Sequence, residues 1–133
     1  MAQADVEVLK ELYAHWRRGD FHTRKFFDPD VVYARIGADT PGDQGEWRGL
    51  TEVAAALAEW RAPWEDLHND AERFIDLADR VLVLDRLSAR GARSTAIVDH
   101  GVAQLFTLRG GRIVRWEAYW DRAEAMRTAG VKE

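Results

Sequence analysis

The chain has no cysteine and only three prolines among its 133 residues. The absence of cysteine excludes disulfide bonds, thiolate nucleophiles and zinc-thiolate sites. Apolar runs long enough to span a bilayer are also missing, and the first residues lack the pattern of a signal peptide. We therefore expect a cytoplasmic protein that does not bind membranes.

An excess of positive charge is missing as well. The 19 Lys and Arg residues are outnumbered by 23 Asp and Glu, which gives a formal net charge of −4, and the arginines are scattered. A nucleic-acid interface needs a basic face, so no nucleic-acid partner is expected. The histidines have no metal-ligand spacing, and there is no nucleotide fingerprint. We expect neither a metal nor a cofactor.

Tryptophan, in contrast, is abundant, with six residues in a short chain. Large rigid aromatic side chains serve both hydrophobic cores and apolar ligand pockets. The hydrophobic fraction of 47% and the charged fraction of 32% are those of an ordinary soluble globular protein. The length fits a single domain over residues 1–133 that can bury a substantial core.

The order of the predicted elements indicates the fold class. Helical spacing predicts helices over 5–18, over 20–27, and from the cap Thr51 to Pro63. Alternating patterns predict strands over 31–36, 67–77, 81–89 and on both sides of 109–111. A last short helix is predicted to begin at Asp121. Residues 37–49 are expected to form a loop. Helices followed by strands indicate an α+β fold, in which a curved, mostly antiparallel sheet wraps around the three helices of the N-terminal half. The inward face of that sheet would line a cone-shaped cavity.

The last predicted hairpin places two polar residues on an otherwise apolar sheet face. Its strands flank Arg109-Gly110-Gly111, and a three-residue loop there would put Gln104 opposite Trp116 and His100 opposite Trp120. Gln104 and His100 would then face the cavity together.

His100 is the candidate general base or acid, because burial and neighbouring groups can move the pKa of an imidazole around neutrality. If Asp85 on the preceding strand lies opposite it, the carboxylate would orient and charge the ring. A register slip by one residue would turn Asp85 to solvent and bring Arg86 inward. The alternative is a core histidine bonded to the backbone or to a neighbour.

Several other side chains are candidates for substrate binding. The amide of Gln104 could bind a carbonyl or hydroxyl group, and Arg35 would need a carboxylate partner or an anionic ligand. The candidate wall residues are large aromatics from the first helix, the first strand, the third helix and the last strand: Trp16, Tyr33, Trp60, Trp116 and Trp120. For the stripe of the first helix, the alternative is plain core packing.

Two segments carry a resemblance to a known family. The run Asp76-Leu-Ala-Asp-Arg-Val-Leu-Val-Leu84 and the ending from Gly111 to Gly130, with Trp116-Glu-Ala-Tyr-Trp120, resemble the SnoaL-like branch of the NTF2-like proteins. The resemblance covers nearly the whole chain. It implies the cone-shaped α+β fold with an apolar pocket, and a homodimer formed through the outer sheet face. Ile113, Glu117 and Tyr119 on that face would suit such a dimer.

The resemblance implies the fold more strongly than a reaction, because the superfamily includes isomerases, epoxide hydrolases, polyketide cyclases and non-enzymatic transport factors. The positions of the catalytic tyrosine and two aspartates of ketosteroid isomerase match Leu12, Arg35 and Gln104. One aspartate of limonene-epoxide hydrolase matches Ala118. Neither known catalytic set is therefore complete in this chain.

Two functions remain open at this point. One is a cofactor-independent isomerase, cyclase or hydrolase that acts on a small apolar oxygenated molecule and uses His100 with Asp85. The other is a non-catalytic ligand-binding or dimerisation module of the same fold, with its pocket filled by its own tryptophans. Cavity volume separates the two, because an enzyme needs an open pocket of about a few hundred Å³.

Overall fold

The computed structural model describes residues 2–37 and 45–132. Its elements are α1 (Ala2–Arg17), the 3-10 helix η1 (Arg24–Phe26), β1 (Phe27–Ile36), β2 (Gly45–Arg48), α2 (Leu50–Arg61), β3 (Trp64–Asp76), β4 (Val81–Gly91), β5 (Ile97–Arg109), β6 (Arg112–Tyr119) and α3 (Arg122–Ala129). The described strands form one six-stranded sheet in the order β2-β1-β6-β5-β4-β3. Adjacent strands of this sheet pair antiparallel, except β1 and β6, which pair parallel. The predicted α+β fold is confirmed.

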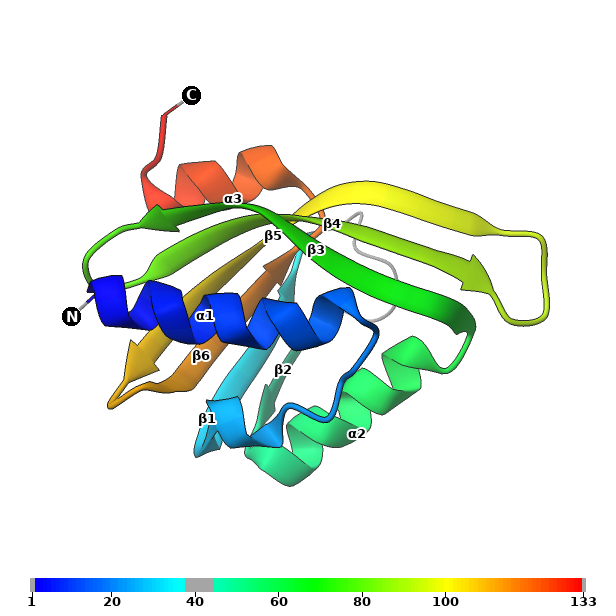
Figure 1. Ribbon diagram of the computed structural model, residues 1–133, viewed down its shortest axis with the longest axis horizontal. Helices are drawn as coiled ribbons and strands as arrows, with labels where there is room; N and C mark the ends of the chain where they lie inside the picture. The colour runs from blue at the N-terminus through cyan, green and yellow to red at the C-terminus, as the bar shows by residue number, and fades with distance from the viewer. Residues whose placement is uncertain (1, 38–44, 133) are drawn as a thin grey trace.

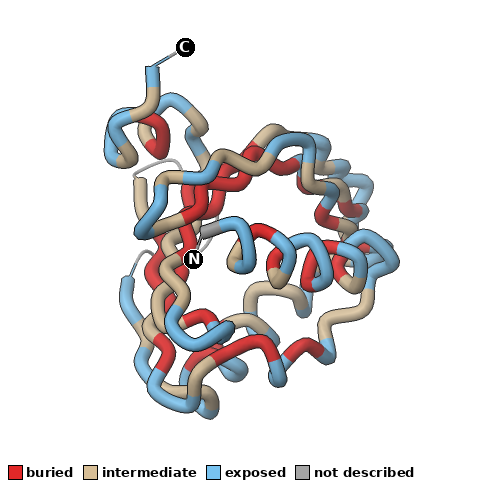
Figure 2. Tube along the Cα trace, turned by 60° about the vertical axis from the view of Figure 1, so that its left-hand side comes forward, coloured by how far each residue is buried: buried red, intermediate tan, exposed pale blue. Residues whose placement is uncertain are grey.

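The sheet is bent around the N-terminal helices. Figure 1 shows α1 lying across one side of the sheet and α2 below it, whereas α3 lies at the opposite side near β4 and β5. Buried positions recur along α1 and along the strands that it faces (Figure 2). Leu9, Leu12, Tyr13 and Trp16 are the large buried side chains of α1, as the helical spacing predicted. Gly19, with a φ of 74°, ends the helical segment in the left-handed conformation that glycine favours.

Three local predictions need correction. The helix expected over 20–27 is only the short η1, because Phe27 already pairs with Ile113 as the first residue of β1. The helix α2 begins at Leu50 after Gly49, which has a φ of 84°, so Thr51 is not its cap. The loop expected over 37–49 contains the edge strand β2, and its residues 38–44 lie outside the described part of the chain.

The hairpin of β5 and β6 has a tighter turn than predicted. Arg109 pairs with Arg112 across Gly110 and Gly111, whose φ values of 59° and 78° fit a two-residue type I′ turn. β6 then carries one extra residue at Val114, because Leu108 pairs with Ile113 and Thr107 with Arg115.

This bulge resets the register of the whole hairpin. Gln104 lies opposite Ala118, and Phe106 lies opposite Trp116, so the predicted pair of Gln104 and Trp116 is wrong. Because Ala103 pairs with Tyr119, the same shift overturns the predicted pair of His100 and Trp120. The extra residue also turns Ile113 into the inner core, where it is fully buried. The predicted position of Ile113 on the outer face is therefore wrong.

The outer face of the sheet is covered in part by α3. Ala125 and Met126 of this helix pack on a second cluster formed by outward-facing sheet residues: Leu82, Leu84, Ala103, Leu105 and Tyr119. Asp121 caps the helix as predicted, since its Oδ1 accepts a hydrogen bond from the Ala123 backbone N–H at 2.9 Å. The homodimer through this face stays a prediction, but Tyr119 belongs to the core of its own chain. None of the described helices has both the length and the apolar character needed to cross a membrane.

Arg122 ties α3 to the strands that carry the candidate site. Its Nε donates a hydrogen bond to the Val102 carbonyl at 3.0 Å, one Nη donates to the Asp85 carbonyl at 2.7 Å, and the guanidinium also pairs with Glu72. Gly101 lies directly beneath this group. A Cβ atom at position 101 would approach the Arg122 Cζ atom to 2.9 Å.

We expect Gly101→Ala to destabilise the protein by about 1 to 2 kcal/mol, because the hydrogen bonds of Arg122 hold the clashing guanidinium in place. Urea unfolding of Gly101→Ala, of Arg122→Ala and of the double variant measures the coupling free energy between the two positions. In the double variant the cost of the added methyl group should disappear. Equal costs with and without the Arg122 side chain would contradict this account.

Candidate functional site

A cavity of about 110 Å³ lies between the inner sheet face and the helices α1 and α2. All seven residues that the sequence suggested for substrate binding line it: Trp16, Tyr33, Arg35, Trp60, Gln104, Trp116 and Trp120. The polar residues Thr23, Arg61 and Asn69 also line it and were not predicted. Asn69 could have been found, because it lies two residues after the buried Leu67 on β3, and residues two apart on a strand face the same side of the sheet.

Trp116 lies at the centre of the aromatic wall. The centroid of its ring system lies 4.4 Å from that of Tyr33 on β1 and 5.2 Å from that of Trp16 on α1. Tyr33 and Trp116 are also register partners in the parallel pairing of β1 with β6. Side chains from three separate elements therefore hold one another in place around the cavity.

Gln104 is the polar residue whose orientation is fixed by this wall. The Trp116 Nε1 donates a hydrogen bond to the Gln104 Oε1 at 2.6 Å. An indole N–H can only donate, so the oxygen of the amide must face Trp116 and its NH2 group must point elsewhere. That NH2 group serves the carboxyl of Asp85, whose charged form it stabilises.

Asp85 is fully buried behind the cavity and does not line it. The Tyr13 hydroxyl donates a hydrogen bond to its Oδ2 at 2.9 Å, whereas its Oδ1 has no hydrogen-bond partner within the described part of the chain. Burial raises the pKa of Asp85 to about 7, although Tyr13, Asn69, Gln104 and the charge of Arg122 all act to lower it. Burial and the nearby carboxyl also raise the pKa of Tyr13. The carboxyl therefore titrates near neutral pH.

The predicted contact between Asp85 and His100 is wrong by two residues. Asp85 pairs with Val102, and His100 pairs with Leu87. The reason is the turn between the two strands, which spans 92–96 instead of 90–94, with the Gly91 N–H donating to the Ala96 carbonyl at 2.8 Å. The sheet face of these residues was predicted correctly: Asp85 and Val102 are both buried, and Gln104 lines the cavity.

His100 lies beside the cavity and does not line it. Its ring stacks on Trp120 with centroids 4.1 Å apart, and its Nε2 lies 3.0 Å from the Trp120 carbonyl oxygen. A carbonyl oxygen only accepts, so Nε2 must carry the proton and Nδ1 keeps a lone pair when the ring is neutral. This is the backbone-bonded arrangement that the sequence left open as the alternative for His100. The catalytic roles of His100 and Asp85 stay predictions.

Arg35 is the buried cation of the cavity wall. Its Nε donates to the Tyr33 hydroxyl at 3.1 Å, and one Nη donates to the Ala56 carbonyl at 2.9 Å. Its guanidinium lies over the ring of Trp47 at 4.7 Å and over that of Tyr33 at 5.4 Å. Among residues 2–37 and 45–132, no carboxylate forms an ion pair with it.

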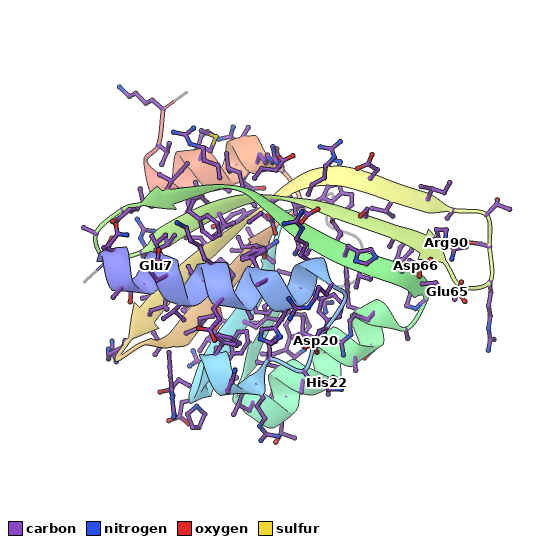
Figure 3. All side chains as sticks on the ribbon, viewed as in Figure 1. Glu7, Asp20, His22, Glu65, Asp66 and Arg90 are labelled. Carbon is purple, nitrogen blue, oxygen red and sulfur yellow. The ribbon has the colours of Figure 1, made fainter. Side chains whose placement is uncertain are left out.

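Charged pairs gather on the outside of the protein. Figure 3 labels Glu65, Asp66 and Arg90 at one end of the β3–β4 ribbon, where the Arg90 guanidinium pairs with both acids. It also labels Asp20 and His22 in the segment between α1 and η1. None of these five residues lines the cavity. In the part of the chain that the structure describes, no group of three or more potential ligands could hold a metal ion.

Comparison with known protein families agrees with this geometry. The model of the SnoaL-like domain matches residues 9–116. The chain belongs to the SnoaL-like family. No curated protein sequence matches this SnoaL-like chain.

Solved structures show how widely the SnoaL-like fold is shared. A protein described as a SnoaL-like polyketide cyclase from Jannaschia sp. CCS1 has a TM-score of 0.76 and 18% identity, covering 98% of this chain and 94% of its own. An NTF2-like protein of unknown function from Burkholderia pseudomallei has a TM-score of 0.76 and 21% identity over 93% and 95%. TerC, co-crystallised with polyporic acid, has a TM-score of 0.75 and 20% identity over 96% and 98%. At these identities the likeness shows the fold alone.

We expect Asp85→Asn to flatten the pH dependence of stability. Between pH 3.8 and about 7 the folded protein keeps a proton on Asp85 that the unfolded chain releases, so the free energy of unfolding falls as the pH rises through this range. The amide keeps an acceptor for Tyr13 and never ionises. Urea unfolding should show the variant more stable than the wild type above this range, by on the order of a few kcal/mol. Stability curves of the two proteins that run parallel from about pH 4 to about pH 8 would contradict the raised pKa.

Proposed function

We propose that this SnoaL-like protein binds a small, apolar, oxygenated organic molecule in the cavity bounded by the sheet, α1 and α2. One observation carries the proposal. The Gln104 amide, oriented by Trp116 at 2.6 Å, stands in a wall made mostly of aromatic and aliphatic side chains. A few oriented polar groups in an apolar cavity are typical of small-molecule sites.

The size of the cavity limits the ligand. Its volume of about 110 Å³ is below the range of a few hundred Å³ that is common for drug-sized ligands. A compact, single-ring molecule therefore suits it better than a polycyclic one. Two proteins of similar fold support a small organic ligand: TerC was co-crystallised with polyporic acid, and a protein from Catenulispora acidiphila is in complex with trimethylamine.

Polar groups at the inner end of the cavity can select the ligand's oxygen atoms. Asn69 is 8% exposed and lines the cavity, and its Oδ1 is buried with no hydrogen-bond partner within the described part of the chain. A rotation of the amide toward the cavity would let this oxygen accept from a ligand hydroxyl. The NH2 group of Gln104 has two N–H donors: one serves the Asp85 carboxyl, and the other can donate to a ligand oxygen. Asp85 lies behind both amides and acts in this proposal as a positioning residue.

Filling the cavity should abolish binding. Ala118 lines the cavity from β6, and Ala55 is an exposed alanine of α2. We expect Ala118→Phe to weaken the binding of benzyl alcohol by at least about tenfold, and Ala55→Phe to leave it unchanged. Isothermal titration calorimetry measures both, with circular dichroism to confirm folding. Undiminished binding by a folded Ala118→Phe variant would show that the ligand lies elsewhere.

A second candidate function is proton transfer by His100. The observation that favours it is the Trp120 carbonyl, 3.0 Å from Nε2, which leaves Nδ1 of the neutral ring free to accept a proton. The base would act without Asp85, because the two residues are not register partners. The reaction class is removal of a proton next to a carbonyl group. His100 does not line the cavity, so the ligand must extend past Trp120, which does, to bring the C–H bond to Nδ1. The proton then passes to Nδ1, and the negative charge of the enolate oxygen faces the Gln104 NH2 group.

His100→Gln should then abolish the exchange of methyl protons of acetophenone for deuterium, followed by NMR in D2O. His68→Gln is the matched control, because the His68 Nδ1 also lies next to a backbone carbonyl, that of Arg17, at 3.0 Å. We expect the control to exchange at the wild-type rate. Catalysed exchange that survives in the His100 variant removes the base from this mechanism and leaves the binding proposal intact.

A further inference from the structure

The structure assigns a charge to the ligand: we propose that it is a compact organic anion whose carboxylate or acidic hydroxyl binds the guanidinium of Arg35. This inference rests on the proposed function, because it places the ligand in the same cavity. It adds the chemical class that the cavity selects.

The first reason is that Arg35 is buried without a counter-ion among the described residues. It is 7% exposed, and the contacts described for it are those to the Tyr33 hydroxyl, the Ala56 carbonyl and two aromatic rings. Neutral acceptors and ring faces offset only part of the cost of burying a cation. Arg35 thus keeps donors for a ligand, in the planar fork geometry that matches a carboxylate.

The second reason is that Asp85, the one buried carboxyl near the cavity among the described residues, does not neutralise Arg35. Asp85 is enclosed behind Gln104 and is bonded to Tyr13, and the positive charge that acts on it is that of Arg122 on the other face of the sheet. Arg35 lies on β1, which is separated from β4 in the sheet by β6 and β5. The two buried charges therefore belong to separate environments.

The third reason is the sign of the other charge in the cavity wall. The described lining contains Arg61 as well as Arg35, and it contains no aspartate or glutamate. Arg61 ends α2, and its guanidinium lies 5.2 Å from the centre of the Phe21 ring. Arg61 is partly withdrawn from water, and this burial lowers the pKa of its guanidinium. The charged side chains of the described lining are thus both cations, in a protein of net charge −4.

A pair of single-ring probes separates charge from shape. Benzoate and benzyl alcohol have the same ring and similar size, but only benzoate is an anion. Calorimetric titration of the wild type with each probe gives the ratio of their affinities. We expect benzoate to bind at least about tenfold more tightly, and its affinity to fall as salt is added.

Variants test whether Arg35 causes the preference for benzoate over benzyl alcohol. Arg35→Met should make the two affinities equal, Arg35→Lys should keep part of the preference for benzoate, and Arg112→Met, at the exposed hairpin turn, should leave it unchanged. If Arg35→Met does not fold, the lysine variant and the salt dependence of the wild type still decide.

The outcomes distinguish the inference from the function on which it rests. Equal affinity of both probes for the wild type, or a preference for benzoate that survives in a folded Arg35→Met variant, overturns the anion inference and leaves the cavity as the binding site. No binding of either probe overturns the proposed function together with the inference.

Discussion

The hydrogen bond from the Trp116 indole to the Gln104 amide is the contact on which the candidate site depends. Because an indole only donates, this bond orients the amide and directs its NH2 group toward Asp85. It also joins two strands across the register that the bulge at Val114 creates. Trp116 in turn touches Trp16 of α1 and Tyr33 of β1, so one contact links the helix, the sheet and the polar centre of the cavity.

Buried polarity in this SnoaL-like protein is divided between two places. Behind the cavity, a carboxyl with a pKa near 7 is surrounded by Tyr13 and two amides; in the cavity wall, Arg35 has no described carboxylate partner. Both groups are costly to bury, and neither is needed to build an apolar core. Residues retained at such a cost are candidates for function, which is why the proposals rest on Gln104, Arg35 and their neighbours.

The sequence predicted the fold class and the wall of the cavity well, because both follow from hydrophobic periodicity. The stripe of α1 and the alternation in β5 identified Trp16 and Gln104 without any knowledge of loops. The contact between His100 and Asp85 failed for a different reason. Strand register depends on the exact residues of each turn, and neither the two-residue displacement of the turn before β5 nor the bulge at Val114 has a signal in the hydrophobic pattern.

The most direct test of the account is a crystal structure of the protein soaked with benzoate. The account predicts density for the ring beside Trp116, with a carboxylate oxygen within hydrogen-bond distance of the Arg35 guanidinium and the Gln104 amide unmoved. Benzoate seated only on exposed arginines such as Arg90, with the cavity closed by its own tryptophans at saturating ligand, would contradict it.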